Sequence, residues 1–371
     1  MPPRIKLRIA AVIVASLSHG VTLVANGEQP NRGIAKPDIE FSSVPAYGSF
    51  DDLRGQVSGV DPKRHRVAVF IFVGGWWTKP TFDSPSTRLA SNGSFVTDIT
   101  TGGVDETATQ IAAFVIPQGA KIPLAKGEQQ LPTVLKGISV ADVVVRRQDK
   151  RRRLDFAGLC WIVKSAGIKV GPGPNYFSGD SSNVWVDEQG HLHLRMTNEA
   201  GKWHCAEVYT EKSFGYGKYT FSMSTPVDQL DPSVVLGLFT WDDAPQQSHR
   251  EIDFEFSRWG KADNTNSQFV VQPWSTLGNM KRFNIKPGTA KSTHVFDWFK
   301  SSVAFRSLDS TTPSSGEPAK ALQSWEYKGK NVPSPGNEKV RINLWLFEGR
   351  PPTGKKETEI IVSSFRFKAQ K

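Results

Sequence analysis

The sequence predicts an all-β protein in which a small immunoglobulin-like β-sandwich is followed by one large β-sandwich. Turn-forming residues are plentiful, with 32 Gly and 24 Pro, and aromatic residues are many, with 22 Phe and 11 Trp. Long helix-period patterns are scarce, and short alternating strands between Gly- and Pro-rich turns are typical of sandwiches. The length of 371 residues favours two domains over one.

Residues 1–27 have the pattern of a cleaved export signal and are left out of the predicted fold. Three basic residues, Arg4, Lys6 and Arg8, precede an apolar run. A membrane span is the alternative, but the uninterrupted apolar part, residues 9–15, is short for a span. We therefore expect a secreted protein, extracellular or periplasmic, without stable membrane insertion.

The net charge of +10 does not by itself indicate a nucleic-acid partner. Basic clusters occur at 63–66 and 146–153, and we interpret them as solvated segments because no aromatic-interleaved basic motif accompanies them. Cys160 and Cys205 form no metal-binding motif, which leaves either one disulfide or two small buried thiols. We expect a monomer that binds no nucleic acid.

The first half of the chain carries the smaller domain. Residues 28–45 are polar and contain proline, which indicates a linker. Strong strand patterns at 67–73 and 109–116 predict an accessory β-sandwich over 46–145, with turn-rich stretches between the strands. The charged run at 146–154 is the predicted basic linker that ends it. Carbohydrate binding is one role open to this domain.

Residues 155–371 form the predicted second domain and carry most of the strand patterns. Two alternating runs around a Gly-bearing turn in 183–196 indicate a hairpin. The other main strands are predicted at 217–223, 234–241, 268–272, 293–299, 340–347 and 359–367. The segment 307–320 is rich in Ser, Thr, Pro and Gly and predicts a loop.

One predicted strand alternates carboxylates with large apolar residues. In an extended strand Glu251, Asp253 and Glu255 share one face, and the apolar residues between them share the other. Three acids at this spacing raise one another's proton affinity, which a purely structural strand has no reason to accept. Hydrolysis of a glycosidic bond does need two carboxyl groups, one ionised and one protonated. The alternative is an exposed, solvated strand face.

Five motifs occur in order along the second domain. They are Cys205-Ala206-Glu207 with the aromatic run 214–219, Phe239-Thr240-Trp241, the acidic strand 251–255, His294-Val295-Phe296-Asp297-Trp298, and Ile342-Asn343-Leu344-Trp345. On these motifs residues 155–371 resemble glycoside hydrolase family 16, in particular its β-glucanase and lichenase members. The first domain resembles no family whose function we can name.

The resemblance implies a concanavalin A-like β-jelly-roll with a cleft across its concave face. It implies that Glu251 is the nucleophile, that Glu255 is the general acid/base, and that Asp253 tunes both pKa values. The expected function is that of a secreted retaining endo-β-glycosidase acting on a β-1,3-1,4-glucan or related polysaccharide. The alternatives are a cell-wall or xyloglucan-type transglycosylase and a non-catalytic glycan-binding protein.

Candidate substrate-binding residues follow from sugar chemistry and the resemblance together. Sugar rings stack on aromatic planes, and sugar hydroxyls need fixed hydrogen-bond partners. The stacking candidates are Trp241, Trp345 and Phe239. The hydrogen-bonding candidates are Asn343, Glu207 and Asn175.

The sequence also departs from the family pattern. The arginine expected two positions after the Glu of the first motif is Tyr209, and an Asn and a Tyr expected on the strand at 268–272 are Val270 and Gln272. We therefore expect altered sugar subsites.

No metal or other cofactor is expected. An acidic residue that helps to hold calcium in bacterial family members is replaced by Ser363 or Ser364, which makes a structural calcium doubtful. His191 and His193 could share a strand face, but no third ligand is evident, so we interpret them as ordinary surface histidines.

Overall fold

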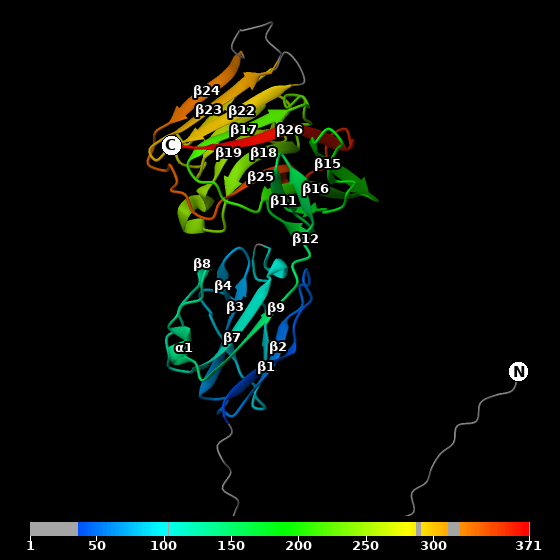
Figure 1. Cartoon of the computed structure of the whole chain (residues 1–371). Helices are drawn as coiled ribbons and strands as arrows, with labels where there is room; N and C mark the ends of the chain where they lie inside the picture. Colours follow the sequence, from blue (N-terminus) through cyan, green and yellow to red (C-terminus); the bar gives the residue numbers. More distant parts are fainter. Residues whose placement is uncertain (1–35, 103, 287–290, 311–319, 371) are drawn as a thin grey trace, which may run out of the picture. The chain divides into compact units, whose positions relative to one another are not determined.

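The computed structural model describes residues 36–102, 104–286, 291–310 and 320–370. From Pro37 onward the chain forms one compact unit whose elements are almost all strands (Figure 1). The all-β fold class is confirmed. The predicted export signal lies outside the described residues, and no helix among the described residues has the length and apolar character to cross a membrane.

The first domain is a sandwich of two sheets. The smaller sheet has the order β1 (Asp38–Ser43), β2 (Leu53–Ser58), β6 (Ser94–Thr97). The larger has the order β8 (Lys126–Glu128), β4 (Trp76–Lys79), β3 (His65–Phe72), β7 (Gln110–Pro117), β9 (Ala141–Arg146), with β5 (Thr87–Arg88) beside β3. Both faces of β3 and β7 are buried, because the smaller sheet covers one face, and a loop region with α1 (Leu135–Ile138) covers the other.

The domain boundaries differ from the predicted ones at one end. Strand β1 lies within 28–45, the range predicted to be a linker, and pairs antiparallel with β2. Ile39 of this strand is buried in the core, so the short apolar pattern there belongs to the sandwich. At the other end β9 finishes at Arg146, and the next strand starts at Arg153, close to the predicted linker at 146–154.

The second domain is a large sandwich with its own core. Its cleft sheet, named for the cavity described below, is antiparallel throughout. The strand order is β10 (Arg153–Phe156), β11 (Leu159–Val163), β16 (Lys202–Thr210), β25 (Lys339–Leu346), β18 (Val234–Trp241), β19 (Ile252–Phe256), β20 (Ser267–Val271), β21 (Met280–Phe283).

The back sheet covers the other side of that core. The strand order is β14 (Val184–Val186), β15 (Leu192–Glu199), β26 (Thr358–Ala369), β17 (Gly217–Met223), β22 (Ser292–Trp298), β23 (Val303–Asp309), β24 (Ala321–Tyr327). Figure 1 shows β17, β22, β23 and β24 side by side. Two short strands, β12 (Ala166–Val170) and β13 (Asn175–Phe177), join β16 near the sheet edge.

Aromatic side chains from both sheets fill the space between them. Phe254 of β19 lies 6.0 Å from Phe296 of β22, ring centre to ring centre, and Phe296 stacks on Tyr219 at 4.5 Å. All three side chains are fully buried. Burial of large apolar area on this scale is the main force that holds two sheets together. The predicted hairpin and the six other main strands of this domain are present; the strands 217–223 and 234–241 have the predicted ends, and the ends of the others are shifted by up to three residues.

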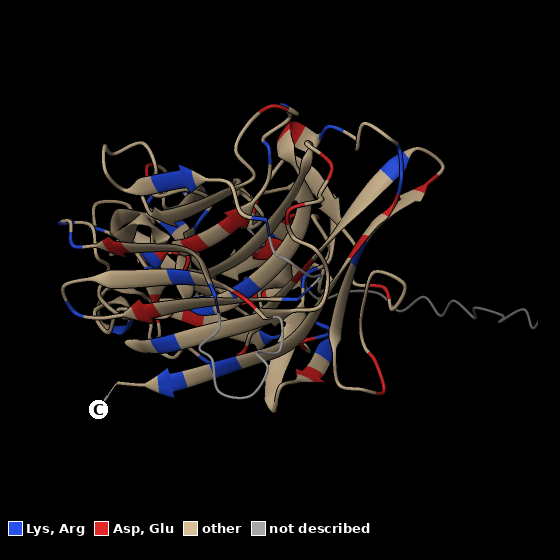
Figure 2. Ribbon diagram, turned by 90° about the horizontal axis from the view of Figure 1, so that it is seen from above, with Lys and Arg blue, Asp and Glu red and all other residues tan. Residues whose placement is uncertain are grey.

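Charged residues are distributed over the whole described structure, and the two cysteines are not paired. Figure 2 shows basic and acidic residues interspersed along strands and loops. Cys205 is buried and Cys160 is half-buried, and both are free thiols, so of the two alternatives the structure has no disulfide. The predicted loop at 307–320 lies mostly outside the described residues; its first part, up to Asp309, completes β23.

Candidate active site

Strand β19 is central in the cleft sheet, between β18 and β20. Its apolar residues Ile252, Phe254 and Phe256 are buried in the core, as the alternation predicted. The carboxyl groups of Glu251 and Asp253 therefore face the other side, together with that of Glu255. Asp253 is only 2% exposed, so the acidic face is not the solvated surface that we considered as the alternative.

The strand register places further side chains beside the acids. Residues directly opposite each other on neighbouring strands project to the same face of a sheet. The first row across the cleft sheet is Glu207, Asn343, Gly237, Glu255, Gln268. The second row is Tyr209, Arg341, Phe239, Asp253, Val270.

Gly237 keeps the first row flat between Asn343 and Glu255. A Cβ atom at this position would lie 2.5 Å from Oδ1 of Asn343 and 3.4 Å from the ring of Phe239. Real Cβ contacts are longer than 2.5 Å, so any side chain here would displace Asn343. The glycine thus allows Asn343 to lie close against the backbone of β18.

Two of the three acids are held by amide groups. Nε2 of Gln268 donates to Oε2 of Glu255 at 2.5 Å, and Nε2 of Gln272 lies 3.4 Å from Oδ2 of Asp253. Burial raises the pKa of all three carboxyl groups, and the neighbouring charge of Glu255 raises that of Glu251 further. For Glu255 the pKa rises to about 7, against the opposing effect of the bond from Gln268. These groups can therefore hold protons near neutral pH.

A fourth carboxylate at the cleft, the buried Glu207, has a different environment. Its side chain is 1% exposed, and it forms ion pairs with Lys164 (3.1 Å) and Arg341 (2.7 Å). Nδ2 of Asn343 is 3.4 Å from the same carboxylate. Burial acts to raise the pKa of Glu207, but the two cations outweigh it, so the pKa is lowered. Glu207 is therefore a fixed anion.

A cavity of about 330 Å³ lies above these residues and forms the cleft. Glu251, Asp253, Glu255 and the row residues Glu207, Gly237, Phe239, Arg341 and Asn343 line it, with Lys164, Trp241 and Trp345. One face of the Trp241 indole is covered by His249, whose ring stacks on it at 3.8 Å. The other face of Trp241 is the one available to a sugar ring. Trp345 is half-buried beside Trp259.

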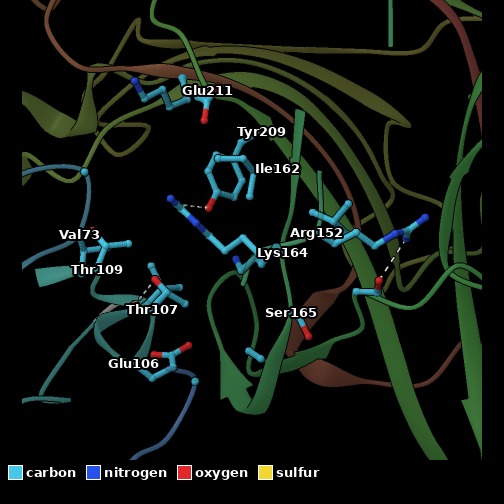
Figure 3. Close-up of a pocket in the computed structure, with 18 of the residues that line it drawn as sticks. Val73, Glu106, Thr107, Thr109, Arg152, Ile162, Lys164, Ser165, Tyr209 and Glu211 are labelled. Carbon is cyan, nitrogen blue, oxygen red and sulfur yellow. Dashed lines mark hydrogen bonds between the residues drawn. The ribbon is translucent and has the colours of Figure 1, made fainter. Parts of the chain in front are cut away.

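A second cavity of about 830 Å³ shares Lys164, Trp241 and Arg341 with the cleft. Figure 3 shows Lys164, Tyr209 and Ile162 along its wall. The dashed line at Tyr209 marks the bond from Nη1 of Arg151 to the phenol oxygen, 3.1 Å long. This hydrogen bond connects Arg151, in the segment between β9 and β10, to β16.

The structure brings most of the predicted site residues together and corrects one of them. The three acids, Trp241, Trp345, Phe239, Asn343 and Glu207 line one cleft. Asn175 does not line it: both of its amide hydrogens bind backbone carbonyls, of Pro172 (2.9 Å) and Leu346 (2.8 Å). Asn175 therefore supports the loop of Pro172, which does line the cleft.

Glu207 also lines the cleft. Its carboxylate oxygens accept bonds from Lys164 and Arg341, so this side chain organises the cleft wall. A direct bond from Glu207 to a sugar hydroxyl stays a prediction, because a carboxylate can accept more bonds than these.

The residues considered for metal binding have other partners. The hydroxyl of Ser363, at the position where calcium was considered doubtful, donates to the carbonyl of Ser222 at 3.1 Å. His193 contacts Asp187 at 3.0 Å and Glu359 at 2.8 Å. No cluster of three or more metal-ligating side chains occurs in the described part of the chain.

Sequence reasoning missed Lys164, Gln268 and Arg341 as members of the site. For Arg341 a signal was available, because it alternates with Asn343 and Trp345 on one predicted strand and so shares their face. Lys164 offered no such signal, since only the pairing of β11 with β16 brings it to Glu207.

No family model matches the chain. Among curated proteins, a β-glucanase of Paenibacillus polymyxa is 32% identical over 123 residues, which are 32% of this chain and 49% of the relative. The chain thus spans about half the length of the curated relative it matches. This relative confirms the resemblance to β-glucanases that the motifs indicated.

Matches among solved structures include other glucanases. The Bacillus licheniformis β-glucanase is 21% identical with a TM-score of 0.44, over 60% of this chain and 98% of that one. A β-1,3-1,4-glucanase (lichenase) from a mouse hindgut metagenome is 21% identical with a TM-score of 0.40, over 56% and 92%. The Bacteroides ovatus mixed linkage glucan GH16 in complex with a G4G4G3G product is 13% identical with a TM-score of 0.43, over 58% and 99%.

Proposed function

We propose that the protein is a secreted, retaining endo-β-glycosidase that hydrolyses a β-glucan through a covalent glycosyl-enzyme. The observation that carries this proposal is the set of three carboxyl groups, one buried and two half-buried, on one face of β19 and the residue before it, beneath a cleft with aromatic walls. Their pKa values are raised, and no cation is paired directly with them among the described ion pairs. Proton-holding carboxyls in a cleft are typical of glycosidases.

The hydrogen bond between Asp253 and Glu251 lowers the pKa of Glu251 and raises that of Asp253. Burial and the charge of Glu255 act more strongly and raise the pKa of Glu251 to about 8, while burial raises that of Glu255 to about 7. The two-carboxylate mechanism needs Glu251 as the anion and Glu255 as the acid. We propose that the enzyme reacts from this form, in which Asp253 holds a proton and donates it to Glu251.

Two displacements at the anomeric carbon complete the reaction. In the first, an oxygen of Glu251 bonds to this carbon while the glycosidic bond breaks, and the leaving oxygen takes the proton of Glu255. In the second, water gives a proton to Glu255 and attacks the same carbon, which releases the carboxylate of Glu251. Two inversions restore the original β configuration.

The substrate class is the less direct part of the proposal. The curated relative is named a β-glucanase, and a flat, uncharged glucan suits a cleft in which Trp241 and Trp345 offer ring faces. The three carboxyls on the floor argue against a polyanionic glycan. We expect mixed-linkage β-1,3-1,4-glucan to be the best of the neutral glucans.

A product survey tests this function. Purified protein is incubated with β-1,3-1,4-glucan, β-1,3-glucan, xyloglucan, chitin and a galactan, and proton NMR follows the first-formed anomer. Internal cleavage of a β-glucan with the β-anomer formed first is expected. First formation of the α-anomer contradicts the retaining mechanism, and transfer to an added acceptor sugar identifies a transglycosylase. Binding without cleavage identifies a non-catalytic glycan-binding protein.

Secretion and the role of the first domain need their own tests. N-terminal sequencing of the protein recovered outside the cytoplasm should begin near residue 28. A protein that stays in the cytoplasm with residues 1–27 intact contradicts secretion. Full-length Glu251→Gln protein, compared with the same protein lacking residues 28–150, should be retained more strongly on insoluble glucan if the first domain binds carbohydrate. Equal retention contradicts that role.

A further inference from the structure

Arg341 is the cation of the cleft wall that lies opposite Tyr209. Its Nη1 donates to Oε1 of Glu207 at 2.7 Å. Its guanidinium carbon lies 4.9 Å from the centre of the Tyr209 ring, which stands directly opposite it on β16. Arg341 also lines the same cavity as Glu251.

The position of this guanidinium explains a departure noted in the sequence. An arginine was expected at position 209, and the structure has the arginine at the cross-strand partner of that position. Directly paired residues have Cβ atoms only about 4.5–5.5 Å apart, so side chains from either strand reach the same space. The cleft thus has a positive charge at the expected place, but β25 supplies it through Arg341, where β16 was expected to supply it at position 209.

Two atoms beside this charge have no hydrogen-bond partner in the described structure. They are Nε of Arg341, a donor, and Oδ1 of Asn343, an acceptor, and both are buried. Asn343 as a residue is only 2% exposed. Leaving a buried donor or acceptor unpaired costs free energy. The two residues alternate on one strand face, and a sugar hydroxyl can satisfy a donor and an acceptor at once.

We propose that Arg341 is a positioning residue of this site, which fixes Glu207 and orients a sugar hydroxyl together with Asn343 in the cleft that Glu251 also lines. The proposal rests on the glycosidase function proposed above. It predicts that the charge matters more than the strand from which it comes.

The electrostatic part has a definite sign. The charged and titratable groups around Glu251 are Asp253 and Glu255 on β19, Arg341 on β25, Glu207 on β16, Lys164 after β11, and Asp243 after β18. Arg341 lowers the pKa of Glu251, and Glu207 raises it. Removal of Arg341 therefore raises the pKa of the nucleophile, which must be ionised to react. The acidic limb of the profile of kcat/KM against pH then moves to higher pH.

The test compares Arg341→Met, Arg341→Lys and the double variant Tyr209→Arg/Arg341→Met with the wild type on β-1,3-1,4-glucan. Arg341→Met should lower kcat/KM about 10-fold to 100-fold, the size expected for a charged hydrogen bond, and shift the acidic limb upward. Arg341→Lys should leave the acidic limb of the kcat/KM profile at its wild-type pH but raise KM. The double variant should return the acidic limb toward its wild-type pH.

A matched control separates this role from a structural one. Arg306→Met removes an exposed arginine that pairs with Asp297 at 2.6 Å on the back sheet, and it should leave the pH profile unchanged. If Arg341→Met is folded by circular dichroism and its acidic limb stays in place, the proposal is wrong. If Arg341→Met does not fold, the double variant provides the test. An acidic limb at the wild-type pH supports the proposal, and an acidic limb at a higher pH contradicts it.

Failure of the proposed function gives a different result. A wild-type protein that binds glucan oligosaccharides without cleaving them refutes the glycosidase. Calorimetry of oligosaccharide binding to the same variants then tests whether Arg341 orients a sugar hydroxyl together with Asn343. Arg341→Met should weaken oligosaccharide binding about 10-fold, and unchanged affinity overturns this part of the inference as well.

Discussion

Two regions of the cleft sheet bury carboxyl groups on the same face, but they treat the charge in opposite ways. On β16 and β25, Glu207 lies between Lys164 and Arg341, and its pKa is lowered although it is buried. At the start of β19 and within it, Glu251 and Glu255 are half-buried residues, amide and acid neighbours surround their carboxyls, and their pKa values are raised.

The difference separates the structural carboxylate from the reactive ones. A buried anion with two cations is stable as an anion and has no proton to exchange near neutral pH. A buried carboxyl without a paired cation gains or loses a proton near neutral pH, which general acid/base chemistry requires. Position in the sheet alone does not distinguish a structural carboxylate from a reactive one, since Glu207 and Glu255 stand in the same row.

The largest expected effect comes from removal of the reactive carboxyls. Glu251→Gln should lower kcat on β-1,3-1,4-glucan roughly 10⁴-fold or more, because the nucleophile is lost, and Glu255→Gln should lower it about 10²-fold to 10⁴-fold. Binding of oligosaccharides, measured by calorimetry, should persist in both. Turnover near the wild-type rate in either variant removes that residue from the mechanism.

Stability should respond in the opposite way in the two regions. Glu207→Gln leaves Lys164 and Arg341 without their anion and should lower the free energy of unfolding by about 3–5 kcal/mol. Glu251→Gln removes a carboxyl whose pKa is raised by burial, so at pH 8 it should leave stability unchanged or increase it. Urea unfolding of both variants at pH 8 measures the contrast. Equal losses in the two variants contradict it.

The flat row between the regions should be sensitive to a single methyl group. Gly237→Ala places a Cβ atom against Oδ1 of Asn343 and should lower stability by about 1–3 kcal/mol. It should also lower kcat/KM about 10-fold, because displaced Asn343 no longer meets the substrate. Gly167→Ala is the control, since nothing lies within 4 Å of the added atom. Identical kinetics for the two variants would show that Asn343 has no role in binding.

The smallest effect concerns the pH dependence of the acid. The bond from Gln268 favours the ionised form of Glu255, so Gln268→Met should raise the pKa of Glu255. Activity then persists to higher pH, and the alkaline limb of kcat/KM should move upward by about 0.5–1 pH unit. Gln272→Met is the comparison, because its bond to Asp253 is long, at 3.4 Å. A downward shift for Gln268→Met contradicts the direction.

Much of this site could be predicted from local sequence. The alternation in 251–256 predicted which side chains of β19 enter the core, because a strand has a period of two. The aromatic Trp241 and Trp345 and the polar Asn343 were identified through ordered motifs, and all three line the cleft. Local pattern was sufficient because each of these residues lies on a strand that the sequence predicted.

The remaining parts depend on pairing between distant strands. Asn175 stands 171 residues from its partner Leu346, and Lys164 stands 43 residues from Glu207. Whether a polar side chain meets a carbonyl, a cation or open cleft is decided by that register, which no local pattern contains. Strand β1 was missed for a similar reason, since its two apolar residues in a largely polar segment form a strand only through pairing with β2.

Trapping of the covalent intermediate tests the division between the two regions most directly. The protein is incubated with an activated 2-deoxy-2-fluoro glucan oligosaccharide, which slows breakdown of the glycosyl-enzyme, and the labelled peptide is identified by mass spectrometry. We predict a single label on the carboxylate of Glu251. A label on Glu207 or on Asp253, or no label in a protein that turns over β-glucan, would contradict the assignment of the nucleophile.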